Sequence, residues 1–215
     1  MVDTNTVIES LARSVRPVRR LPSPGRRVVR WLAMGLPVIG LFGIIMGARP
    51  DLGTKLSEPA FVVPFVAAFA TAVFAAHAAF ASSVPGTPRW WLWLPAPPFA
   101  LWVGSLGHQC WQDWLRLGAD GIVFELDFAC LPTIAIVGAV PAIAMVMMVR
   151  RSAPLMPRLT AFFGALAAAA LAYVGLRLVH LEDAALMVLV WQFGAVALLA
   201  TVSGAFGRGL FPSRG

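Results

Sequence analysis

The chain has 215 residues, of which 59% are apolar and only 13% are Asp, Glu, Lys or Arg. Soluble globular domains carry about 25% charged residues, so this composition excludes a disordered chain and argues against an ordinary soluble enzyme. The net charge of +7 is typical of a protein that meets either nucleic acid or a membrane surface, and the positions of the charges decide between them.

The first 30 residues form a polar, arginine-rich tail that is too short to build a hydrophobic core of its own. Ile8, Leu11 and Val15 recur at a helical spacing within it. This pattern predicts a short amphipathic helix near residues 5–15.

Two interpretations of the tail remain open. In one, it is a solvated leader that lies on the anionic inner leaflet of a membrane. In the other, it folds onto a cytoplasmic partner and inserts its three apolar side chains into a groove, with Arg19 and Arg20 contributing to the same contact.

Six apolar runs follow, each long enough to cross a bilayer of about 30 Å as a helix. In chain order they are Trp31–Ala48, Pro59–Ser83, Trp90–Leu106, Phe128–Val149, Leu159–Leu176 and Ala184–Phe206. They predict an all-α membrane protein in which residues 31–207 form a six-helix transmembrane bundle, followed by a short tail at 208–215.

The composition within these runs argues against several functions. His77 is the only ionisable side chain inside them, whereas transporters and intramembrane proteases need charged or catalytic groups at membrane depth. We therefore expect neither enzymatic activity nor a cofactor. The Gly43-x-x-x-Gly47 motif and the alanines at 167–170 predict close helix packing.

Charges flanking the runs predict the orientation. If the N-terminus is cytoplasmic, 13 of the 17 basic residues face the cytoplasm and 8 of the 10 acidic residues face outward, which gives +11 inside and −4 outside. Because basic residues concentrate on the cytoplasmic side, both termini are expected in the cytoplasm of a bacterial inner membrane. The basic character therefore reflects membrane topology, and direct nucleic-acid binding is not expected.

The chemically distinctive side chains fall on the predicted outer side. His108 and Cys110 lie in the loop predicted at 107–127, Cys130 opens the fourth run, and His180 lies in the loop after the fifth. Three interpretations of the two cysteines stay open: a structural or redox-switched disulfide, a metal or electrophile sensor that includes a histidine, and inert thiols. The identity of any metal is not determined by this spacing.

Several short motifs resemble the NrsF family, the negative regulators of sigma F. They are Arg16-Pro17-Val18-Arg19-Arg20-Leu21, Gly47-Ala48-Arg49-Pro50-Asp51-Leu52, Ser83-Val84-Pro85-Gly86, Cys130, and His180 with Glu182 ahead of Trp191. The resemblance implies a six-span inner-membrane anti-sigma factor that holds an extracytoplasmic-function sigma factor and releases it under stress.

The resemblance also implies that Cys130 is a sensing cysteine. Several relatives place a second cysteine directly after the last-loop histidine, whereas here Leu181 follows His180 and the second cysteine is Cys110. The stress specificity is therefore not carried over. A small transporter or channel, or an accessory subunit of a membrane complex, stays as the alternative function.

Overall fold

The computed structural model describes residues 3–14, 21–118, 130–152 and 155–179, with positions 194, 198, 201, 202 and 205, and the side chains of all of these except 130–135. Every regular element within that part of the chain is a helix, which confirms the predicted all-α class. The elements are α1 (Thr4–Ser14), α2 (Pro24–Met46), α3 (Leu52–Lys55), α4 (Pro59–Ala81), η1 (Arg89–Trp93, a 3₁₀-helix), α5 (Ala96–Leu117), α6 (Cys130–Arg150) and α7 (Pro157–Arg177).

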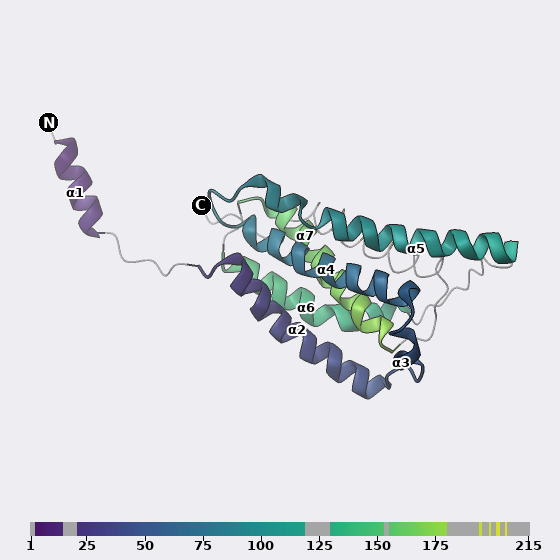
Figure 1. The fold of residues 1–215 in the computed structure, drawn as a ribbon. Coiled ribbons are helices and arrows are strands. Elements are labelled where there is room, and N and C mark those ends of the chain that lie inside the picture. Colours follow the sequence, from purple (N-terminus) through teal and green to yellow (C-terminus); the bar gives the residue numbers. More distant parts are fainter. Residues whose placement is uncertain are drawn as a thin grey trace.

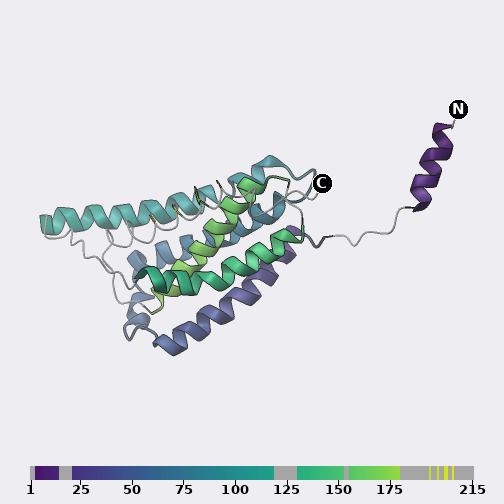
Figure 2. The ribbon, with the colours of Figure 1, turned by 180° about the vertical axis from the view of Figure 1, so that it is seen from behind.

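The long helices form an up-and-down bundle. Figures 1 and 2 show α5 along one edge and α2 along the opposite edge, with α4, α6 and α7 between them. Helix α7 packs on α4 and α6, α2 packs on α6 and α4, and α5 packs on α4. Helix α1 stands apart from the bundle (Figure 1), and none of its residues is buried.

Small side chains allow the two central helices to approach closely. Residues 167–170 of α7 are four alanines, all buried, and Ala167, Ala169 and Ala170 belong to the same core as the buried alanines of α4. Alanine lets helix backbones come near each other, so that van der Waals contact between the two backbones stabilises the pair. The prediction for residues 167–170 is confirmed, whereas Gly47 has a φ of 83° and ends α2 with no atom near its Cβ position.

Proline and glycine set the ends of the long helices. Pro24, Pro59 and Pro157 each occupy the first turn of a helix, where a missing N–H costs nothing. Gly118 follows α5 with a φ of 62°, a conformation that suits glycine. These signals place the start of α2 at Pro24, ahead of the Trp31 boundary expected from the loss of charge.

The number of membrane-spanning helices is lower than predicted. Among the described residues three helices are long and apolar enough to cross a membrane: α2, α4 and α7. Helix α6 contributes a shorter apolar helix at Ile136–Arg150, and the sixth predicted run lies almost wholly outside the described residues. The predicted count of six is therefore wrong for the part of the chain that the structure describes.

The third predicted run differs most from expectation. Residues 89–93 form a 3₁₀-helix, the regular helix begins only at Ala96, and it continues to Leu117 through the predicted loop. The prolines at 95, 97 and 98 explain the break, because proline fits the first turn of a new helix and not its interior. The second half of α5 is consequently helical and carries polar side chains such as Gln109 and Asp113.

Candidate functional site

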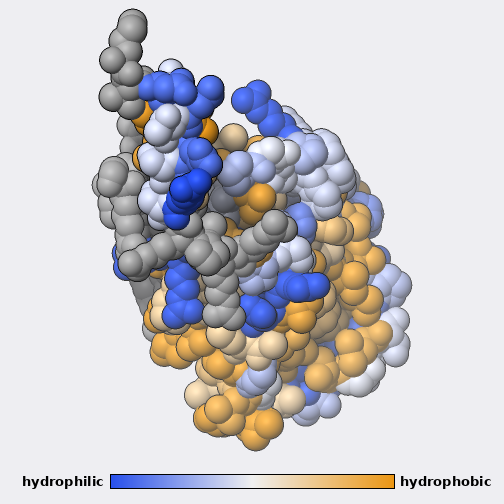
Figure 3. All heavy atoms as spheres, turned by 90° about the vertical axis from the view of Figure 1, so that its left-hand side faces the viewer, coloured by the Kyte–Doolittle hydropathy of each residue, from blue (hydrophilic) through white to orange (hydrophobic). Residues whose placement is uncertain are grey.

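One end of the bundle is strongly basic. The starts of α2 and α7 and the ends of α4 and α6 meet there, and we call it the basic end. Its arginines are Arg26, Arg27, Arg30, Arg89, Arg150, Arg151 and Arg158, and all except Arg27 are exposed. Figure 3 looks onto this end and shows hydrophilic residues interrupting the apolar surface. The arginines that the sequence assigned to one side of the membrane thus do meet at one end of the fold.

Arg27 ties three helices together at the basic end. Its Nη1 donates to Ser83 Oγ at 3.0 Å, and its Nη2 donates to the Met148 carbonyl at 2.9 Å and to Ser152 Oγ at 2.8 Å. The guanidinium carbon lies 4.3 Å from the centre of the Phe80 ring, and the residue is 3% exposed. We call this arrangement the Arg27 clasp.

The acceptors of the Arg27 clasp come from chain just beyond two helix ends. Ser83 follows the end of α4 and Ser152 follows the end of α6. Each hydroxyl donates to a carbonyl three residues earlier, at 2.7 Å in both cases. Because each hydroxyl proton is used locally, the oxygen lone pairs are free to accept from the guanidinium.

A second polar contact joins the central helices at the same end. The hydroxyls of Ser82 and Thr160 lie 2.6 Å apart and link the end of α4 to the start of α7. Both residues are buried, and Thr160 also donates to the Met156 carbonyl. The two contacts hold the connections at 82–95 and 151–156 against each other.

A small cavity opens between these connections, and we call it the loop pocket. Its volume is about 100 Å³, and its walls come from residues between Ala81 and Leu92 and from Leu155 and Met156. Trp91 in its wall stacks on His77 of α4, with ring centres 4.5 Å apart. His77 Nδ1 has no hydrogen-bond partner among the described residues.

The N-terminal helix presents the predicted apolar side chains to solvent. Helix α1 confirms the helix expected near 5–15, and Ile8 and Leu11 are 59% and 60% exposed on it. Glu9 and Arg13 form an exposed ion pair at 2.8 Å, one helical turn apart. Val15, Arg19 and Arg20 lie outside the described residues, so their roles stay predictions.

The opposite end, where α3 lies, carries the Arg49-Pro50-Asp51 motif and is called the α3 end. Arg49 and Asp51 form a two-pronged ion pair, with Nε–Oδ1 at 2.7 Å and Nη2–Oδ2 at 2.9 Å. The Arg49 backbone N–H donates to the Leu178 carbonyl at 3.1 Å, and the Phe61 ring lies near the guanidiniums of Arg49 and Arg177, at 5.5 and 4.6 Å. The motif therefore acts as a joint between α2, α4 and α7.

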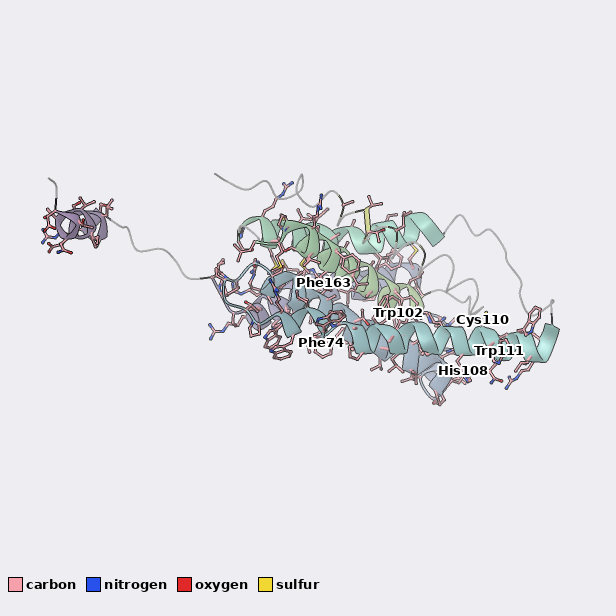
Figure 4. All side chains as sticks on the ribbon, turned by 90° about the horizontal axis from the view of Figure 1, so that it is seen from above. Phe74, Trp102, His108, Cys110, Trp111 and Phe163 are labelled. Atoms are coloured by element: carbon pink, nitrogen blue, oxygen red, sulfur yellow. The ribbon has the colours of Figure 1, made fainter. Side chains whose placement is uncertain are left out.

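Two of the four predicted sensing residues, His108 and Cys110, lie on the second half of α5. Figure 4 shows His108, Cys110 and Trp111 together on the half that leads away from Trp102. His108 is exposed, while Cys110 is partly buried and carries a free thiol. Residues two apart on a helix point in different directions, so His108 and Cys110 do not face one ligand. No group of three or more metal-binding side chains occurs among the described residues.

The other two predicted sensing residues are not placed. Cys130 begins α6, but its side chain lies outside the described residues, as does the whole of His180. Whether a disulfide or a metal joins any of them therefore stays a prediction.

Two functional contacts escaped the sequence analysis. Arg27 was counted only as one of many topology-determining arginines, although it is the buried one among the seven at the basic end. Gln109 Nε2 donates to the Ala60 carbonyl at 2.6 Å. That carbonyl lacks its usual helical donor because Pro64, four residues later, has no N–H. A proline inside a helix is a sequence signal for such a contact, but it does not reveal which residue supplies the donor.

Comparison with known proteins gives one finding. The family model described as "NrsF: Negative regulator of sigma F" matches residues 11–211. No curated protein and no solved structure matches the chain. The matched range includes α2 to α7, both ends of the bundle and the last turn of α1.

Proposed function

The chain belongs to the NrsF family of negative regulators of sigma F, so its partner is a sigma factor, and on that premise we propose that it holds an extracytoplasmic-function sigma factor at the bacterial inner membrane. An envelope stress signal would release the sigma factor. The observation that carries the proposal is the family match over residues 11–211. Three helices apolar enough to span a membrane support the membrane location.

We infer that the basic end faces the cytoplasm with both termini. Its seven arginines meet at one end of the bundle, whereas Asp51, Glu58 and Asp113 lie toward the α3 end. Basic residues are retained on the cytoplasmic side of bacterial membranes. A sigma factor acts in the cytoplasm, so the same orientation presents α1 and the basic end to it.

Helix α1 is the proposed primary contact for the sigma factor. Ile8 and Leu11 are exposed on one face of α1, a helix with no buried residue, which is how a helix-in-groove ligand looks before it binds. Val15, Arg19 and Arg20 would extend the contact toward the bundle. Binding would be strong only if burying these side chains outweighs the entropy lost when the tail becomes ordered.

The sensing step is proposed for the cysteines at the α3 end. Cys110 lies beside Gln109, whose hydrogen bond to Ala60 joins the second half of α5 to α4. Oxidation of Cys110, or its pairing with Cys130, would disturb this joint. A shift of α4 would move Ser82 and Ser83, which follow its other end, at the basic end. Such a shift alters sigma factor affinity when the bundle has two packings that bind the partner differently. We propose no catalytic role for these residues.

Co-purification of the full-length chain with a co-expressed extracytoplasmic-function sigma factor from the same bacterium tests the binding proposal. The double variant Ile8→Asp/Leu11→Asp should lower the recovered sigma factor by about tenfold or more, because a charge cannot enter an apolar groove. Ser10→Asp is the matched control on the same exposed helix and should keep binding. If the wild-type chain recovers no sigma factor, the proposed function is wrong; if the double variant binds normally, the tail is not the contact.

Reporter induction under oxidative or heavy-metal stress tests the sensing proposal. Cys110→Ser and Cys130→Ser should each blunt induction of the sigma factor's target genes. Ser105→Ala, one and a half turns before Cys110 on α5, is the control and should induce normally. Unchanged induction in both cysteine variants would show that the signal is read elsewhere.

A further inference from the structure

The basic end concentrates positive charge, whereas the described acids Asp51, Glu58 and Asp113 lie toward the α3 end. The seven arginines of the basic end lie in residues 21–50, 59–112 and 128–181, and these stretches contain no Asp or Glu. Of the two acids in the N-terminal tail, Glu9 is already paired with Arg13. A concentration of like charge destabilises the free protein and favours association with an anionic surface.

The loop pocket lies among these arginines. Arg89 forms part of its wall, and Arg158 comes two residues after Met156 in the opposite wall. Leu155 is 60% exposed and Met156 36%, so an apolar edge is open to solvent next to the charges. Apolar side chains surrounded by arginines are typical of a binding surface, in which the apolar part supplies affinity and the charges supply orientation.

Side-chain contacts fix the segments that border the pocket. Arg27 joins Ser83 to Ser152, and the Ser82–Thr160 contact joins the end of α4 to the start of α7. A partner would therefore meet a surface whose borders at Ser82 and Ser83 are already held in place. Preformed surfaces bind more tightly for a given contact area.

The pocket also lies within reach of the tail. Ser83 contacts the first turn of α2, and Ser82 and Val84 line the pocket, so it lies beside the point where the tail joins the bundle. Residues 15–23 between α1 and α2 span at most about 30 Å. One partner molecule can thus contact α1 and the pocket together, and two linked contacts strengthen binding more than either alone.

We propose that the loop pocket, with Arg89 in its wall and the exposed Arg158 two residues beyond Met156, is a second binding surface for the sigma factor. It receives an apolar side chain from a helix of the partner whose flanking residues are acidic. This inference rests on the proposed function, since it adds a contact on the bundle to the one made by α1. It also links the pocket to the α3 end through α4, which is followed by Ser82 in the pocket wall and by Ser83 in the Arg27 clasp.

Titration of the full-length chain with the co-purifying sigma factor tests this surface. The chain is placed in phosphatidylcholine nanodiscs, which carry no net lipid charge. Arg89→Glu/Arg158→Glu should raise the Kd about tenfold or more and reduce its salt dependence, because two attractive contacts become repulsive. Leu155→Asp should raise it several-fold. Arg116→Glu, an exposed arginine at the far end of α5, is the matched control and should stay within about twofold.

Each outcome separates the two proposals. A wild-type chain that binds no sigma factor overturns both of them. Normal binding by the wild type and by the Arg89→Glu/Arg158→Glu and Leu155→Asp variants, with loss only in Ile8→Asp/Leu11→Asp, overturns the second surface and leaves the tail contact standing. Normal sigma factor binding with less co-purified phosphatidylglycerol in the Arg89→Glu/Arg158→Glu variant overturns it in favour of a lipid site. Unchanged melting temperatures of the same variant exclude misfolding as the cause of a loss.

Discussion

Replacing Arg27 with alanine removes the contact that joins α2, α4 and α6 at the basic end. Three hydrogen bonds from a charged donor contribute about 1.5–3 kcal/mol each, and the stack on Phe80 adds about 1 kcal/mol. The cost of burying a guanidinium offsets several kcal/mol of this, because every partner is neutral. We expect a net loss of about 2–4 kcal/mol in the free energy of unfolding.

Equilibrium unfolding in mixed detergent micelles, followed by tryptophan fluorescence, measures this loss. Arg27→Lys should lose a large part of it, because one ammonium group cannot reach Ser83 after α4 together with Met148 and Ser152 at the end of α6, as the guanidinium does. A double-mutant cycle of Arg27→Ala with Ser83→Ala should give a coupling energy of about 0.5–3 kcal/mol. Arg26→Ala, the exposed neighbour, should stay within about 0.5 kcal/mol of wild type.

The reasoning about the Arg27 clasp fails under two results. If Arg27→Ala is as stable as Arg26→Ala, burial offsets the whole gain and the clasp contributes no stability. If the cycle gives no coupling, the Arg27–Ser83 contact contributes nothing beyond the separate effects of the two residues.

Two further changes test contacts within the bundle by the same unfolding measurement. Gln109→Leu should cost about 1 kcal/mol, because the Ala60 carbonyl loses its donor, and Pro64→Ala should restore part of the loss by supplying a helical N–H. Gly175→Ala should cost about 1–3 kcal/mol, because its Cβ would lie 3.0 Å from side-chain atoms of two other helices. Gly104→Ala, at an exposed helical position with no atom within 4 Å, should instead gain about 0.5–1 kcal/mol.

These changes also have outcomes that would count against the contacts. A Gln109→Leu variant that Pro64→Ala does not rescue would mean that the glutamine acts through something other than the orphaned carbonyl. If Gly175→Ala and Gly104→Ala change the free energy of unfolding equally, α7 is not closely packed at Gly175.

Composition and charge order predicted the coarse structure well. The apolar runs predicted most of the long helices, and the spacing of Ile8, Leu11 and Val15 predicted α1. Run length alone overestimated the count of spans, because absence of charge does not distinguish a spanning helix from the 3₁₀-helix and proline break at residues 89–98. Helix ends were misplaced for a related reason. Helix α2 starts at Pro24, within an arginine-rich stretch that was assigned to the tail because it is charged.

What the sequence determined by itself was most of the long helices and the end of the bundle at which the described helix-flanking arginines lie. Both follow from local chemistry, since apolar runs form helices and alternating helices carry their flanking charges to alternate ends. Only the tertiary structure decided which of seven similar arginines is buried and which glutamine serves a proline-freed carbonyl. Those roles depend on partners more than 45 residues away in the chain, such as Ser152 for Arg27. A local sequence pattern cannot predict which distant residue becomes the partner.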